Sequence, residues 1–175
     1  EFRRVLFRSD PTSGRSAGYG VPREPELPFS GVYRLDPERG ELTLLLDDFA
    51  KPNGLCFSRD ESLLYVNDTV RQHIRVFEVT EDGGVTNGRL FAKLTGDKPG
   101  VADGIKVDSQ DNVYSCGPGG IHLFTAEGDC LGVIEPPEYA ANFVFGGDDL
   151  KSLFITATTS LYRVQLKVAG HPTYT

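Results

Sequence analysis

The sequence predicts an all-β fold of the β-propeller class, and three observations support this prediction. A similar phrase occurs three times, beginning at Asn53, Asp103 and Asn142. Each phrase runs from a strand-like alternation of apolar and polar residues, through a polar turn, into a second strand that carries an aromatic residue. The chain has 20 glycines and 11 prolines, which supply turns between short runs of strand-forming residues. Units of about 40 residues with four short strands are typical of propeller blades.

The predicted elements follow this repeat along the chain. Residues 31–37 and 41–48 predict a hairpin. The next unit spans about residues 53–94 and the following one about residues 103–134, and each contains four predicted strands. A last unit starts at Asn142 and shows three strands. No segment predicts a helix. A β-sandwich is the alternative fold, but it would not explain why a short polar residue recurs at one point of each unit.

The N-terminal segment differs from the rest of the chain. Residues 1–9, EFRRVLFRS, are rich in arginine and lack the repeat, so we interpret them as a non-native leader that vector or adapter sequence encodes. Residues 10–175 then form a partial propeller domain, in which residues 10–30 are expected to be a long loop. About three blades and a hairpin are fewer than a closed ring needs. We therefore expect a truncated ring with exposed strand edges, taken from a longer protein.

Composition excludes several classes of function. The net charge of −7 argues against a nucleic-acid-binding groove, which requires clustered lysine and arginine. No apolar run approaches the roughly 18 residues of a membrane helix. The three cysteines, Cys56, Cys116 and Cys130, form no Cys-x-x-Cys pair, which favours reduced thiols in a cytoplasmic protein. The oligomeric state is not determined by any of these features.

Asn53 and Asp103 are the first candidates for functional residues. Both precede a glycine and the predicted innermost strand of a unit, so in a propeller both would face the central channel. One carboxylate together with amide oxygens makes an oxygen-rich site for a hard cation such as Ca²⁺ or Mg²⁺. The alternative is turn chemistry, because Asn-Gly and Asp-Gly are common turn pairs. Local spacing favours the turn, whereas the matching positions of the two pairs favour a site.

Two further residues are candidates with equally open alternatives. Asn142 starts its phrase as Asn53 and Asp103 do, and it is a candidate for contacting substrate. Its alternative role is to cap a strand through side-chain hydrogen bonds. Asp68 ends a predicted strand and is a candidate for supporting the metal ligands from behind or for orienting Asn53. Its alternative role is in the turn that follows the strand.

Three segments carry a resemblance to a known family: PNGLCFSRDESLLYVNDT, ADGIKVDSQDNVY and ANFVFGGDDLKSLFITATTSLYRVQL. They resemble the C-terminal half of the SMP-30/gluconolactonase/LRE-like proteins, over nearly all of residues 28–170. The resemblance implies a six-bladed propeller with one divalent metal ion in its channel, and hydrolysis of a sugar lactone such as gluconolactone. It further implies that Asn53 and Asp103 are metal ligands and that Asp103 also acts as the catalytic base.

The same resemblance implies what this chain lacks. The other metal ligands of the family are a glutamate from the first blade and an asparagine from an earlier blade, and neither has a counterpart here. We therefore expect this chain by itself to be inactive. The expected ion is Ca²⁺, ahead of Zn²⁺, Mg²⁺ and Mn²⁺. A non-enzymatic calcium-binding or protein-interaction propeller is the alternative function, because propellers host many functions.

Overall fold

The computed structural model describes residues 5–8 and 27–172, which form four antiparallel sheets. The first sheet contains β1 (Val5–Arg8), β2 (Ser30–Asp36) and β3 (Glu41–Phe49). The second contains β4 (Pro52–Phe57), β5 (Leu63–Asp68), β6 (His73–Val79) and β7 (Val85–Lys93). The third contains β8 (Ile105–Val107), β9 (Val113–Gly117), β10 (Gly120–Phe124) and β11 (Cys130–Ile134). The fourth contains β12 (Ala140–Gly146), β13 (Ser152–Ala157) and β14 (Leu161–Gln165).

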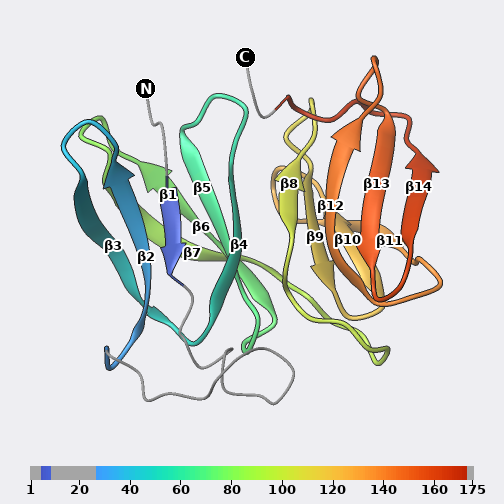
Figure 1. Cartoon of the computed structure of the whole chain (residues 1–175), viewed down its shortest axis with the longest axis horizontal. Coiled ribbons are helices and arrows are strands. Elements are labelled where there is room, and N and C mark those ends of the chain that lie inside the picture. The colour runs from blue at the N-terminus through green and yellow to red at the C-terminus, as the bar shows by residue number, and fades with distance from the viewer. Residues whose placement is uncertain (1–4, 9–26, 173–175) are drawn as a thin grey trace.

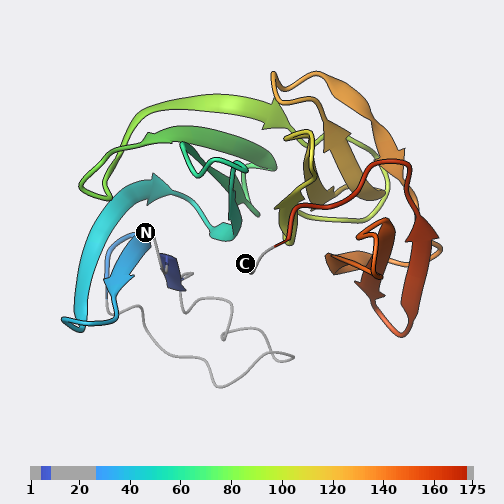
Figure 2. The same cartoon turned by 90° about the horizontal axis from the view of Figure 1, so that it is seen from above.

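The four sheets follow one another in an arc. Within each sheet, consecutive strands pair side by side (Figure 1). Seen from above, the sheets surround a common axis and leave one side open (Figure 2). The first strands of neighbouring sheets are in contact, since β4 contacts β8 and β8 contacts β12. These first strands therefore line the inner side of the arc, and the predicted β-propeller class is confirmed.

The strands agree closely with the sequence prediction. The hairpin, the two four-stranded units and the last three strands all form where they were expected, and the described residues contain no helix. The described part of the chain accordingly has no helix with the length and hydropathy of a membrane span. One element was not predicted: β1 pairs antiparallel with β2 although it lies within residues 1–9. The origin of that segment stays a prediction, and most of the expected long loop lies outside the described residues.

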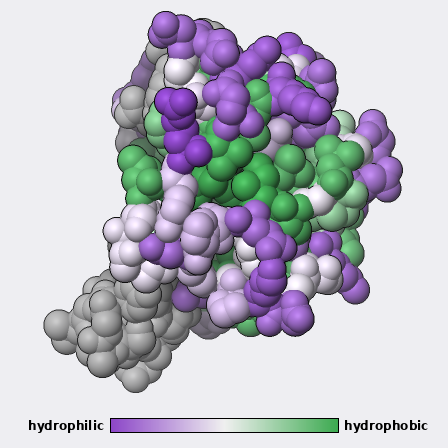
Figure 3. Space-filling model, turned by 90° about the vertical axis from the view of Figure 1, so that its right-hand side faces the viewer, coloured by the Kyte–Doolittle hydropathy of each residue, from purple (hydrophilic) through white to green (hydrophobic). Residues whose placement is uncertain are grey.

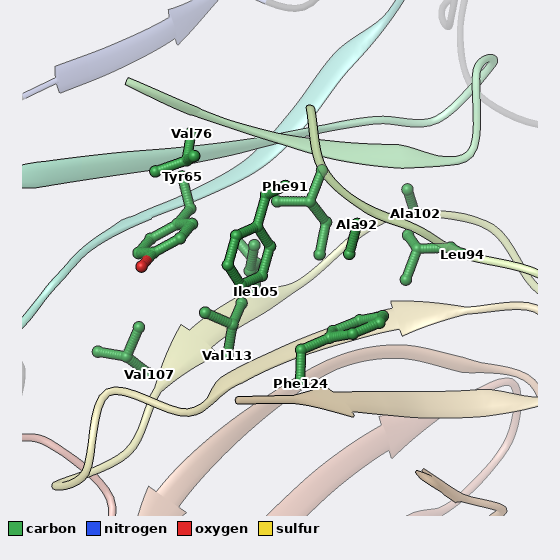
Figure 4. Packing of buried hydrophobic residues seen from close by; sticks show 11 residues of the cluster. Tyr65, Val76, Phe91, Ala92, Leu94, Ala102, Ile105, Val107, Val113 and Phe124 are labelled. Atoms are coloured by element: carbon green, nitrogen blue, oxygen red, sulfur yellow. The ribbon is translucent and has the colours of Figure 1, made fainter. Parts of the chain in front are cut away.

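The sheets are held together by hydrophobic side chains between their faces. One cluster joins the second and third sheets (Figure 4). At its centre the buried Phe91 ring makes edge contacts with two other rings, with centroids 5.0 Å from that of Tyr65 and 6.1 Å from that of Phe124. Equivalent clusters join the first sheet to the second and the third to the fourth. Because these faces are buried, each sheet is held in an orientation that places its first strand nearest the axis.

Phe91→Leu should lower the free energy of unfolding by about 1–2 kcal/mol, because it removes two edge-to-face ring contacts but keeps most of the apolar volume. Urea unfolding measures this change. The matched control is Phe154→Leu on β13, whose half-buried ring pairs with no other ring in the described part of the chain, and which should cost less. Equal losses for the two variants would show that the ring contacts contribute nothing beyond buried area.

The outer end of the arc carries an exposed hydrophobic surface. Figure 3 shows a hydrophobic area on the side of the molecule formed by the last strands, surrounded by polar side chains. On β12, Val144 is 50% exposed and pairs with Phe154. The corresponding pair of the second sheet, Cys56 and Tyr65, packs within the cluster that the third sheet covers. The exposed surface of the fourth sheet is thus equivalent to the surface of the second sheet that the third sheet covers.

All three cysteines are free thiols, as predicted. Burial raises the pKa of Cys56 and of Cys116 to about 12, so neither side chain is a thiolate at neutral pH. Cys130 is exposed on β11. The cytoplasmic location that reduced cysteines suggest stays a prediction.

Candidate functional site

The structure brings Asn53 and Asp103 together on the inner side of the arc. Asn53 lies in β4, and Asp103 lies two residues before β8, the strand that contacts β4. The Asn53 side chain lies near enough to the carboxyl group of Asp103 to act on its pKa. Asn53 Nδ2 also lies 3.1 Å from Thr69 Oγ1 and 3.4 Å from the carbonyl oxygen of Ala102. Two side chains that are fifty positions apart in sequence therefore share one small region.

The environment of Asp103 is unfavourable for a bare charge. Burial raises the pKa of its carboxyl group above the usual value, while the nearby Asn53 side chain and the positive charge of Lys51 act in the opposite direction. Asp103 is half-buried and makes no salt bridge within the described residues. A cation beside this carboxylate would offset the cost of its partial desolvation.

Gly54 and Gly104, which follow Asn53 and Asp103, allow close packing between neighbouring sheets and do not form turns. A Cβ atom on Gly54 would lie 2.0 Å from the carbonyl oxygen of Asp103, and one on Gly104 would lie 2.4 Å from Asn142 Oδ1. Neither glycine has the positive φ that Asn-Gly and Asp-Gly hairpin turns use. The turn alternative for these pairs is therefore wrong. Glycine is needed at both places because the first strand of one sheet passes directly against the next.

Asn67 is a buried residue of this region that the sequence analysis missed. It lies in β5, is fully shielded from solvent, and its amide contacts three separate segments. Its Oδ1 accepts a hydrogen bond of 2.8 Å from the backbone N–H of Gly54. Its Nδ2 donates to the carbonyl oxygen of Asp103 at 2.7 Å and to Ser115 Oγ at 3.1 Å. An asparagine near the end of the apolar run LLYV is the one sequence signal that could have indicated it.

Asn142 lies close to Asp103, but not at the equivalent point of its sheet. The aromatic residues Tyr65, Tyr114 and Phe154 pair across their sheets with Cys56, Lys106 and Val144. Asn53 lies three residues before its partner position Cys56, and Asp103 lies three residues before Lys106. Asn142 lies only two residues before Val144. Asn142 is therefore equivalent to Gly54 and Gly104. The predicted equivalence of Asn142 is wrong by one residue.

The side chain of Asn142 is exposed and packs against Gly104. Its Oδ1 accepts a hydrogen bond of 2.8 Å from the backbone N–H of Phe143, which is the local capping that the alternative role described. Contact with substrate stays a prediction for this residue.

Asp68 binds the backbone of two loops. Its carboxylate accepts hydrogen bonds from four N–H groups, those of Ala50, Lys51, Val70 and Arg71, over 2.7–3.2 Å. These bonds fix the turn after β5 to the segment that leads into β4. They match the turn role, and none of them reaches Asn53. Support of the metal ligands by Asp68 stays a prediction.

The oxygen atoms at this site are of the type that a hard cation prefers, but they are too few to complete its coordination. An amide oxygen and a carboxylate are ligands that Ca²⁺ and Mg²⁺ accept. No group of three or more His, Cys, Asp or Glu side chains suited to a metal occurs in residues 5–8 and 27–172. Ca²⁺ takes about six to eight oxygen ligands. Asn53 and Asp103 can therefore supply only part of a coordination shell.

Comparison with known proteins gives a consistent result. Residues 9–159 match the model of the family described as SMP-30/Gluconolactonase/LRE-like region. A gluconolactonase from Zymomonas mobilis is 36% identical over 154 residues, which are 83% of this chain and 43% of the relative. The pentonolactonase XacC from Haloferax volcanii is 27% identical over 165 residues, which are 82% of this chain and 56% of the relative. The chain thus spans about half the length of these curated relatives.

Solved structures show the same relationship. A gluconolactonase structure from Xanthomonas campestris superposes with a TM-score of 0.81 at 34% identity, covering 93% of this chain and 53% of that one. Regucalcin from Agrobacterium tumefaciens, described as a calcium-binding protein, superposes with a TM-score of 0.69 at 22% identity, covering 83% of this chain and 56% of that one. The second similarity shows a shared fold alone.

Proposed function

Because the chain belongs to the SMP-30/gluconolactonase/LRE-like family, we propose that it supplies part of the active site of a metal-dependent sugar lactonase, within a longer protein. The single observation that carries this proposal is the close approach, across neighbouring sheets, of the segments that carry Asn53 and Asp103. The names of the relatives, gluconolactonase and pentonolactonase, support a lactone as the substrate class. A sugar lactone such as gluconolactone is the proposed substrate.

The proposed cofactor is one divalent ion, Ca²⁺ ahead of Zn²⁺, Mg²⁺ and Mn²⁺. Asn53 would hold it through a neutral oxygen and Asp103 through a carboxylate, and this low ligand charge leaves the ion strongly electrophilic. A divalent ion bound here polarises the lactone carbonyl and lowers the pKa of nearby water. The remaining ligands would be water, substrate and residues outside those described here.

Asp103 would act on the attacking water. Its half-buried carboxylate accepts one proton of that water, or holds the water in position, while the water oxygen bonds to the lactone carbonyl carbon. The ring carbon–oxygen bond then breaks, the ring oxygen takes up a proton, and the product is a hydroxy acid. Asn142 lies beside Gly104, and its exposed amide is suited to contact the hydroxyl groups of a sugar lactone.

The proposal is tested by two measurements. Titration calorimetry on the longer protein should detect binding of Ca²⁺, and Asn53→Ala should weaken that binding about tenfold or more because a ligand is lost. Gluconolactone hydrolysis by the longer protein, followed by pH-stat, should stop when a chelator is added and return with Ca²⁺. Gln110→Ala removes an exposed amide in a turn and serves as the control for both measurements.

Two results would overturn the proposal in different ways. Hydrolysis at an unchanged rate in excess chelator would remove the metal from the reaction. Calcium binding without hydrolysis of any sugar lactone by the longer protein would instead support the alternative of a non-enzymatic calcium-binding propeller.

A further inference from the structure

We propose that Asn67 is the positioning residue of this site, which fixes the backbone that carries Asn53 relative to the backbone that carries Asp103. The inference rests on the proposed function and extends it to a side chain that touches neither metal nor substrate. It is carried by the three hydrogen bonds of one fully buried amide.

The amide of Asn67 joins the two halves of the site directly. One of its contacts is the N–H of Gly54, the residue bonded to Asn53, and another is the carbonyl oxygen of Asp103 itself. Both Nδ2 hydrogens are used, the second by Ser115 Oγ. Ser115 in turn donates to the carbonyl oxygen of Cys116, so the network is anchored in β9. Asn67 therefore links the second and third sheets directly beside the two candidate ligands, whereas the other bonds between these segments, such as that of Thr69 Oγ1, reach Ala102.

The Asn67 amide is tightly packed against the backbone that it joins. A Cβ on Gly54 would lie only 3.1 Å from Asn67 Nδ2, so the two residues are in tight contact without space for a bridging water. Loss of the amide would leave the Gly54 N–H and the Asp103 carbonyl oxygen without this partner in a largely buried place. Each group would then move toward another partner, and the ligands would move with it.

The repeat shows that the fold itself does not need an asparagine here. Two residues after the aromatic of each unit stand Asn67, Cys116 and Thr156. The Cys116 side chain cannot bridge two backbone groups, and Thr156 Oγ1 makes a single bond of 3.1 Å to the carbonyl oxygen of Asn142. An amide that bridges two sheets occurs at this position only between the segments that carry Asn53 and Asp103, within the described repeats. This restriction points to a role in the site.

The test compares two variants of Asn67 with a matched control. Asn67→Leu keeps the branched shape, with larger methyl groups, but makes no hydrogen bond, and Asn67→Thr replaces the amide by one hydroxyl, as found at the equivalent place of β13. The control is Val66→Ala: Val66 is its fully buried neighbour, but it packs on the opposite face of β5, in the cluster toward the first sheet. Stability is measured by urea unfolding of this chain. Calcium affinity, by titration calorimetry, and kcat and KM for gluconolactone are measured in the longer protein.

The expected result is a loss of function that stability does not explain. Calcium affinity should fall about 10- to 100-fold in Asn67→Leu and less in Asn67→Thr, as is usual when a partner of a metal ligand is removed. In the longer protein kcat should fall by a similar factor. Val66→Ala should lower stability but leave the affinity of the folded protein within about twofold of wild type.

Two outcomes would overturn the inference and can be told apart. If wild type binds calcium but both Asn67 variants retain its affinity when fully folded, or lose only as much as Val66→Ala, then Asn67 is merely a structural residue. If wild type itself neither binds calcium nor supports hydrolysis, the proposed function fails and the inference falls with it.

Discussion

Asp103→Asn should reduce lactone hydrolysis by the longer protein about 10²- to 10⁴-fold, the range usual for loss of a positioned base. The amide cannot accept a proton from water, and it replaces the proposed anionic metal ligand by a neutral one. Both effects act on the rate, while the shape of the side chain is kept. The pH-stat assay with gluconolactone measures the change, at a calcium concentration that saturates the variant.

The same substitution should stabilise the metal-free chain at neutral pH. Burial raises the pKa of Asp103 in the folded state above its ordinary value of 3.8. A carboxyl group with a raised pKa binds its proton more tightly when folded. The free energy of unfolding therefore falls as the pH rises from the pKa of the unfolded state through the higher pKa of the folded state, and it does not recover at higher pH. Asparagine has no such loss, so the variant should unfold at higher urea concentration at pH 7, and its advantage should vanish near about pH 3.

A control separates this local effect from a change in net charge. Asp97→Asn removes one negative charge at an exposed position before β8 and should change neither rate nor pH dependence of stability. Full activity of Asp103→Asn would exclude Asp103 as the base. Equal stability profiles of Asp103→Asn and wild type from acid to neutral pH would show that the carboxyl group pays no desolvation penalty.

The fold could be predicted from local sequence because each strand has a recognisable pattern within its own residues. The alternation of apolar and polar residues, together with turn residues, predicted every strand from β2 to β14. A strand that buries one face between sheets has this alternation in its own sequence. The pairing of Asn53 with Asp103 was also accessible, because a repeat places equivalent residues at equivalent points. The resemblance to a family added the chemical roles that we propose for them.

The errors concern contacts between segments that are distant in sequence. Asn67 could not be found because its partners Asp103 and Ser115 are 36 and 48 positions away, and nothing near it in sequence indicates them. Asn142 was misplaced because the connection between β12 and β13 is one residue longer than that between β4 and β5: the paired residues Val144 and Phe154 are ten positions apart, and Cys56 and Tyr65 are nine. The glycines were ambiguous because a tight turn and a close approach both require a missing side chain.

Gly54→Ala is expected to cost about 3 kcal/mol of unfolding free energy or more, at the upper end of the overpacking range. The added Cβ would lie 2.0 Å from the carbonyl oxygen of Asp103, and 2.9 Å from Ile105 Cγ2. Neither neighbour is the free end of a flexible side chain, so the second and third sheets must separate. Because φ at Gly54 is not positive, the cost is steric and not conformational, and alanine would otherwise favour the folded state slightly.

This separation should also destroy the proposed site, because Gly54 sits between the two proposed ligands and contacts the amide that joins their backbones. Calcium binding by Gly54→Ala in the longer protein should be undetectable by calorimetry even at temperatures where the protein stays folded. Gly40→Ala provides the comparison: its Cβ would meet no atom within 4 Å, but its φ of +65° is strained for alanine. It should cost only about 1 kcal/mol and leave calcium binding intact. Wild-type stability of Gly54→Ala would mean that the two sheets do not approach as closely at the axis as the geometry of Gly54 and Asp103 requires, and the shared metal site would lose its structural basis.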